Sequence, residues 1–142
     1  MTLRNVTNIF FNIMTENEIA YQIVGASLDL HREVGPGLLE SAYESALLYE
    51  LRERGLSVKQ QCAMPFHYKN IMMEVGYKID LLVQDKVIIE LKSVEKLHPV
   101  HYAQTLTYLK LSNLKLALLI NFNEKFIKDG IHRIVNNLQV LL

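Results

Sequence analysis

Three ionisable residues interrupt two apolar segments near the middle of the chain. The stretch KIDLLVQDKVIIELKS, residues 78–93, places Asp80, Glu90 and Lys92 among β-branched and aliphatic residues. Two carboxylates buried close together lose hydration and repel each other. A divalent cation removes the repulsion, because hard cations such as Mg²⁺ bind carboxylate oxygens and keep waters and phosphate oxygens as further ligands. A lysine on the same face can stabilise developing negative charge or help to deprotonate a water, so the three residues suit metal-dependent phosphodiester cleavage.

The loop between the two segments decides whether these residues meet. Side chains alternate along a strand, so Glu90 and Lys92 share a face. A two-residue turn at Asp85-Lys86 would pair Asp80 with Leu91 and send Glu90 to the opposite face. An odd-length loop or a bulge within 84–87 places Asp80 beside Glu90, and the site requires one of these. The alternative is an amphipathic hairpin with one solvated face, but Leu82 and Ile88 on that face weaken it.

A further carboxylate precedes these strands, in the stretch GPGLLESAYESALLYEL. On a helix, Glu40 is in line with Tyr43, Leu47 and Leu51, in a stripe expected to face the sheet. Glu40 is therefore either a favourable acid in a first helical turn or a third carboxylate that leans toward the metal.

A later helical stretch, VHYAQTLTYLKLS, carries Gln104 and Tyr108 four residues apart on one face, with His101 one turn earlier. For Gln104 or Tyr108 alone, a half-buried polar helix face is the simpler interpretation. His101 has no second histidine at a suitable spacing, and the chain has one cysteine, so we predict no zinc site.

The elements that must position these residues follow from periodicity and breakers. Thr15 and Glu18 form a capping-box pair at the start of the first helix. The β-branched, alternating segments predict strands, and the apolar run 115–122 predicts a strand buried on both faces. The expected order is a helix from Thr15 to VGPG, a helix over about 38–54, strands within 56–69, 72–84 and 86–94, a helix opened by Pro99, a strand over 115–122, and a tail over 126–142 that is either strand or helix. This order predicts an α/β fold, a mixed central sheet flanked by helices.

Composition places the chain among globular proteins, with 142 residues and a net charge of zero. Cys62 is the single cysteine, so no intrachain disulfide forms, and no apolar stretch reaches the ~18 residues of a membrane span. We therefore expect a cytoplasmic protein with no membrane partner.

The domain is expected over 14–142, with 1–13 as a loose N-terminal extension or an upstream start. Because the whole chain is neutral, nucleic acid would need focused charge; the basic residues expected around the cleft are Lys110, Lys115, Lys128 and Arg133.

Several separated blocks resemble one protein family. GPGLLESAY, with Glu40 and Tyr43, is similar to the signature of the GxxExxY proteins, and IDLLV, IIELKSV and HYAQTLTYLKL follow in that family's order. The resemblance covers the chain from about Met14 onward. It implies a PD-(D/E)xK nuclease-like, restriction-endonuclease-like core of helix, three strands, helix, strand. The sequence KID replaces the proline-containing PD of the superfamily but keeps the acid.

The resemblance also implies roles for the residues. Asp80, Glu90 and Glu40 resemble metal-binding carboxylates for Mg²⁺ or Mn²⁺, and Lys92 resembles the lysine of the Glu-x-Lys pair. Gln104 and Tyr108 resemble the Gln-x-x-x-Tyr helix motif, which positions the lysine or a substrate phosphate. The implied activity is a metal-dependent nuclease acting on nucleic acid, with DNA favoured. A catalytically inert domain that binds nucleic acid or a protein partner is the alternative, and the neutral charge leaves a homodimer or a partner protein open.

Overall fold

The first helix begins where the capping pattern predicts. The computed structural model describes residues 13–74 and 76–139, and helix α2 spans Glu16–Val34. The Thr15 hydroxyl accepts a hydrogen bond from the Glu18 backbone N–H at 3.2 Å, so one of the free donors of the first turn is paired. At the other end Gly35 adopts φ +66°, a left-handed conformation that glycine tolerates and that stops the helix.

The second helix, α3, spans Glu40–Glu53 and begins two residues later than expected. The difference has a local cause: the Leu38 N–H donates to the hydroxyl of Tyr43 at 3.1 Å. Leu38 therefore belongs to the turn that enters the helix. Gly55, with φ +83°, ends the helical segment as expected.

A mixed five-stranded sheet forms the centre of the molecule. Strands β5 and β6 run parallel and are joined by α4, which spans Pro99–Ser112 and begins at its proline. The other neighbouring pairs are antiparallel. The strands lie in the order β1-β4-β5-β6-β7, with bounds Val58–Ala63, Lys78–Val83, Val87–Lys92, Leu116–Asn121 and Ile131–Val135. The predicted α/β fold with its restriction-endonuclease-like order is confirmed.

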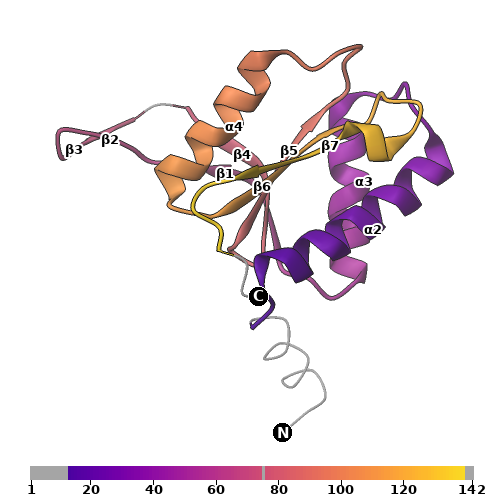
Figure 1. Cartoon of the computed structure of the whole chain (residues 1–142), viewed down its shortest axis with the longest axis horizontal. Helices are drawn as coiled ribbons and strands as arrows, with labels where there is room; N and C mark the ends of the chain where they lie inside the picture. Colours follow the sequence, from indigo (N-terminus) through magenta and orange to yellow (C-terminus); the bar gives the residue numbers. More distant parts are fainter. Residues whose placement is uncertain (1–12, 75, 140–142) are drawn as a thin grey trace, which may run out of the picture.

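Helices cover both faces of this sheet, α2 and α3 on one side and α4 on the other (Figure 1). Each side has its own apolar core: Leu81, Ile89 and Leu118 pack toward α2 and α3, whereas Ile88 and Ala117 pack toward Tyr108 and its neighbours on α4. Every residue of β6 is buried, as its continuous apolar run predicts.

A small hairpin extends away from the body of the molecule (Figure 1). Strands β2, Phe66–Tyr68, and β3, Ile71–Met73, pair with each other and not with the main sheet. The prediction of one strand each within 56–69 and 72–84 was therefore wrong, since each segment divides into two strands. Tyr77 connects the hairpin base to the body, with edge-on ring contacts to Phe66 at 6.3 Å and to Tyr108 at 6.0 Å.

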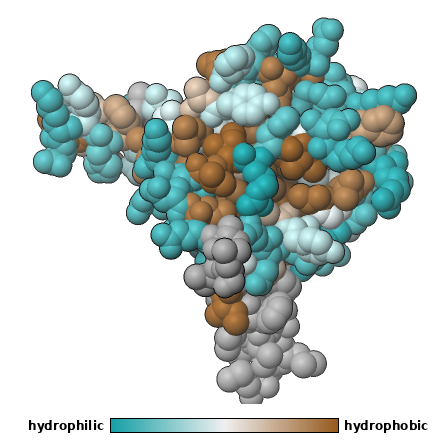
Figure 2. Space-filling view, in the orientation of Figure 1, coloured by the Kyte–Doolittle hydropathy of each residue, from teal (hydrophilic) through white to brown (hydrophobic). Residues whose placement is uncertain are grey.

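The ambiguous tail combines two elements. A short 3₁₀ helix, η1, spans Ile127–Gly130 and leads directly into β7, which lies at the sheet edge. Figure 2 shows apolar side chains gathered in the middle of the face where β7 runs between α4 and α2, with hydrophilic side chains around them.

Candidate metal and phosphodiester site

The β4–β5 hairpin has the odd-length loop that the site requires. Val83 pairs with Val87, so three residues, 84–86, form the loop, and the last backbone pair before the site is Leu81 with Ile89. Gln84 and Asp85 both adopt φ +54°, which closes this loop. The same register continued by one residue puts Asp80 directly opposite Glu90. The prediction that Asp80 and Glu90 share a face is confirmed.

At Asp80 the two strands exchange side-chain hydrogen bonds in place of the backbone ladder. The Asp80 N–H donates to Glu90 Oε1 at 3.1 Å, and the Leu91 N–H donates to Asp80 Oδ2 at 2.9 Å. Each carboxylate thus satisfies a backbone donor of the facing strand. The sheet opens at this point and holds both acids in fixed positions.

Glu90 is unusually buried for a carboxylate, with 5% of its surface exposed. Burial, and then the negative charge of Asp80, raise the pKa of Glu90 to about 8. The Asp80 N–H and the positive charge of Lys92 oppose this shift, while a hydrogen bond between the two carboxyl groups adds to it. Without a cation, Glu90 therefore keeps its proton at neutral pH, which lowers the repulsion between the two carboxyl groups.

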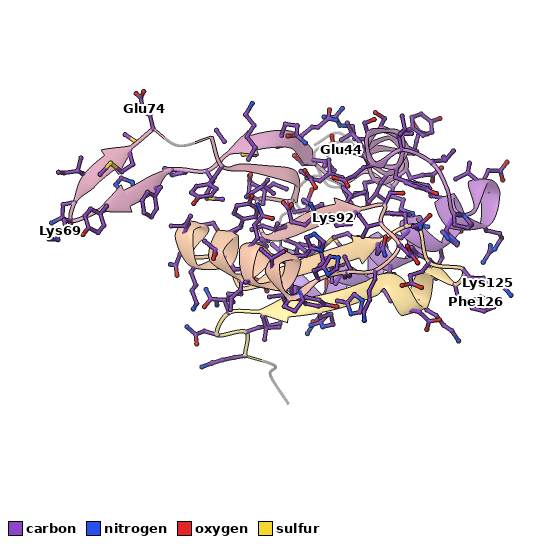
Figure 3. The ribbon with its side chains drawn as sticks, turned by 90° about the horizontal axis from the view of Figure 1, so that it is seen from above. Glu44, Lys69, Glu74, Lys92, Lys125 and Phe126 are labelled. Atoms are coloured by element: carbon purple, nitrogen blue, oxygen red, sulfur yellow. The ribbon has the colours of Figure 1, made fainter. Side chains whose placement is uncertain are left out.

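Lys92 follows two residues after Glu90 and is half-buried. Within the described residues it forms no ion pair, but its charge acts on Glu40, Glu90 and His101. Figure 3 shows Lys92 and Glu44 near the middle of the molecule, far from Lys69 and Glu74 on the β2–β3 hairpin. The lysine is thus close enough to the carboxylates to act on them without being neutralised by a direct ion pair.

Glu40 is the first residue of α3 and is exposed. Partial desolvation and the charge of Asp80 raise its pKa, while Lys92 and the Ser93 N–H lower it. Glu40 and Asp80 line the same open hollow of about 530 Å³. Glu40 is therefore close enough to Asp80 and Lys92 for their charges to act on its pKa.

Tyr43 explains why the helix start points Glu40 toward the sheet. This residue is fully buried, and its ring stacks on Phe122 with centroids 4.7 Å apart. Its hydroxyl donates to the Gly35 carbonyl at 2.6 Å and accepts the Leu38 N–H. Since it fastens both ends of the GPGL turn, Tyr43 holds the first turn of α3 in place; Leu47 and Leu51 complete its buried stripe.

Gln104 and Tyr108 are joined on α4. Gln104 Nε2 donates to the Tyr108 hydroxyl at 2.9 Å, and Tyr108 is buried. Burial, then the charges of Glu90 and Asp80, raise the pKa of Tyr108. The Tyr108 hydroxyl therefore lies on the carboxylate side of α4. The expected positioning of Lys92 by Gln104 has no hydrogen bond to support it in the described part of the chain.

Sequence reasoning missed two polar residues, Glu44 and Gln61. Gln61 Nε2 donates to Glu44 Oε1 at 2.8 Å and to Asp80 Oδ1 at 3.2 Å, and both residues line the hollow. Glu44 could have been found from its position one helical turn after Glu40. Nothing in the sequence indicated a role for Gln61, since a polar residue in an expected strand is ordinary.

Two of the four basic residues expected around the cleft lie elsewhere. Lys115 precedes β6, whose first residue pairs with Val87 at the opposite end of β5 from Lys92. Arg133 on β7 donates to Asn17 of α2 at 2.6 Å. The expectation was therefore wrong for Lys115 and Arg133.

The donor set fits a hard cation that takes only one or two carboxylates from the protein. Asp80 and Glu90 offer carboxylate oxygens side by side, which is how Mg²⁺ is bound when waters and substrate phosphates complete its shell. Over residues 13–74 and 76–139, no three His, Cys, Asp or Glu side chains converge tightly enough to enclose a metal on their own. Glu40 thus stands by the pair without joining it.

Comparison with known proteins agrees with this geometry. No curated protein and no solved structure matches the chain significantly. In the described part, no helix has the length and apolar character needed to cross a membrane. The family model described as PD-(D/E)XK nuclease superfamily matches residues 17–134, most of the chain. The chain therefore belongs to the PD-(D/E)XK nuclease superfamily.

Proposed function

We propose that this protein is a nuclease that hydrolyses phosphodiester bonds of nucleic acid with Mg²⁺ or Mn²⁺ held by Asp80 and Glu90. The observation that best supports this proposal is the pairing of these two carboxylates across the opened β4–β5 hairpin, with Lys92 close to them. Burial, and then the repulsion between the two acids, keep a proton on Glu90, and a divalent cation that replaced this proton would be bound strongly.

Each residue then has a physical role. A bound cation would polarise a phosphate oxygen and lower the pKa of a water ligand. Lys92, which forms no ion pair within the described part of the chain, would stabilise the negative charge that develops on the phosphate or the attacking water. Glu40 lines the same hollow as Asp80 and would assist a bound cation through its water ligands. The Tyr108 hydroxyl oxygen accepts a hydrogen bond from the Gln104 amide. The hydroxyl can therefore still donate a hydrogen bond to a carboxylate or a phosphate.

The domain and its setting are part of this proposal. Met14 is buried in the core and its carbonyl accepts a hydrogen bond from Lys86 Nζ, which supports a domain over 14–142. The expected extension, 1–13, lies outside the described residues except for Ile13. We assign DNA as the substrate and the cytoplasm as the site of action, with a homodimer or partner protein to help a neutral chain hold a duplex.

One alternative function has an observation in its favour. The protein is neutral overall, and no enclosing group of three metal ligands occurs among its described residues. A catalytically inert domain that binds nucleic acid or a protein would share both features. It would have less reason to keep Glu90 buried beside Asp80, which is why the nuclease is preferred.

The test is a cleavage assay with Mg²⁺ and with Mn²⁺ on single-stranded, duplex and branched DNA and on RNA. Lys92→Ala should reduce cleavage by about 10²–10³-fold, the usual effect of removing one charge-stabilising group. Lys96→Ala, the loss of an exposed lysine four residues later, is the matched control and should cleave as the parent does. Equal cleavage by both variants would reject the assignment of Lys92, and binding without cleavage on every substrate would favour the inert domain.

A further inference from the structure

Gln61 has a backbone conformation that its residue type disfavours. It adopts φ +50° within strand β1, a left-handed region that glycine, and to a lesser degree asparagine and aspartate, tolerate but glutamine rarely adopts. It stands opposite Asp80, between the pairs Gln60–Leu81 and Cys62–Ile79. Strain of this kind persists where the surrounding structure enforces it, and it concentrates at functional sites.

The kink at Gln61 coincides with a change in how the neighbouring strand packs. On β4, Leu81 belongs to the core under α2 and α3, whereas Ile79, two residues earlier, packs in the core under α4. Regular alternation would place both on one face. The sheet therefore twists at Asp80, and the strained residue of β1 lies at the same level.

The side chain of Gln61 connects two acids. Its Nε2 donates one proton to Glu44 Oε1 at 2.8 Å and the other to Asp80 Oδ1 at 3.2 Å. Two carboxylates fix the amide orientation, because the reversed amide would turn its oxygen toward both negative charges. Glu44 is itself fixed, since its second oxygen accepts from Gln60 Nε2 at 2.7 Å.

Asp80 is consequently held through both of its oxygens. The Leu91 N–H binds Oδ2, and the Gln61 amide binds Oδ1. Carboxylates that ligate metals are commonly oriented by such outer hydrogen bonds, and removing one of these partners weakens metal binding.

We propose that Gln61 is a positioning residue, which holds the Asp80 carboxylate in the orientation that binds the cation, and that Glu44 anchors Gln61 for this task. The proposal rests on the proposed function for the identity of the ligand. The strained backbone at residue 61 is what carries the amide into the hollow between α3 and β4.

Gln61→Gly tests the proposal because its two effects have opposite signs. Glycine accepts φ +50°, so the metal-free variant should melt at or above the temperature of the parent. Loss of the amide should weaken Mn²⁺ binding by about 10–100-fold. Mn²⁺ affinity is measured by calorimetry and by the electron paramagnetic resonance of free Mn²⁺, and stability by circular dichroism in chelator.

Two further variants make the test specific. Gln61→Asn keeps an amide on a residue type that tolerates positive φ, but it is too short to reach both acids; it should fold like the parent and bind Mn²⁺ as weakly as Gln61→Gly. Lys59→Gly introduces a glycine into the same strand at an exposed residue that pairs with Asp85 and does not line the hollow; it should bind Mn²⁺ like the parent.

Parental Mn²⁺ affinity in both Gln61 variants would overturn the proposal, as would equal losses in the Lys59 and Gln61 variants. A Gln61→Gly protein that melts well below the parent would show that the residue serves the fold instead. A parent that binds Mn²⁺ without cleaving any substrate would reject only the nuclease assignment. A parent that binds no Mn²⁺ would reject the metal site together with this proposal.

Discussion

Replacing Glu90 by glutamine should change how the stability of the metal-free protein depends on pH. The pKa of Glu90 is raised from its ordinary value of 4.5 to about 8 by burial and by Asp80. Between these two values the folded state binds a proton that the unfolded state has released. The unfolding free energy of the parent therefore falls as pH rises from 4.5 to about 8, and the contribution of the protonated group is lost above that range.

The size of the effect follows from the shift. At 1.36 kcal/mol for each pKa unit, the parent loses up to about 5 kcal/mol across this range. Small domains have total stabilities of roughly 5–15 kcal/mol, so the loss is a large share of the whole. Glutamine at position 90 stays neutral, and its carbonyl can still accept the Asp80 N–H. Glu90→Gln should therefore match the parent at pH 5 and exceed it at pH 9.

The assay is urea unfolding followed by circular dichroism, in chelator, at each pH unit from 5 to 9. Subtracting the Glu90→Gln curve from the parent curve isolates the contribution of Glu90 from those of other groups, among them Glu40. Glu95→Gln, a change of an exposed glutamate, is the control and should run parallel to the parent. Parallel curves for the parent and Glu90→Gln would show that Glu90 ionises normally. The conclusion that burial and Asp80 raise its pKa would then be wrong.

Two more predictions concern the same region. Asp80→Asn should stabilise the metal-free protein at pH 9, because it removes a negative charge that faces ionised Glu90. Mn²⁺ at ~100 times Kd should stabilise the parent by about 2.7 kcal/mol, whereas it should not stabilise this variant. Equal Mn²⁺ shifts in thermal melts would place the ion elsewhere. Tyr43→Phe should cost about 1–3 kcal/mol in urea unfolding, because the Leu38 N–H and the Gly35 carbonyl lose their partner. A cost near zero would mean that water replaces the hydroxyl.

The sequence predicted the acid pair because the chemistry of the residues constrained the backbone. A two-residue turn would have separated Asp80 from Glu90, so a working site demanded an odd-length loop, and the structure has a loop of three residues. Helix α2 followed from the Thr15 capping pair and from the helix breakers Pro36 and Gly37, and the crossover helix followed from Pro99. In each case one residue type with a strict geometric preference fixed the local structure.

Other features depend on contacts that no local pattern reveals. The β2–β3 hairpin turns at Lys69 and Asn70, both with positive φ, yet its strands looked like continuations of their neighbours. The left-handed backbone of Gln61 could not be predicted from the sequence, because glutamine has no preference for that conformation. The late start of α3 depends on the hydroxyl of Tyr43, five residues beyond Leu38.

The proton on Glu90 connects the fold of this protein to its chemistry. A pair of acids enclosed by two sheet strands would destabilise the metal-free protein if both were ionised, and the raised pKa of Glu90 shows that a proton prevents this. In the proposed site a cation would displace that proton, so cation affinity should rise with pH up to about 8. Asp80 is held differently, because the Leu91 N–H and the Gln61 amide both donate hydrogen bonds to its carboxylate. The two acids are thus unequal in the proposed site: Asp80 would be a fixed ligand, and Glu90 would exchange its proton for the cation.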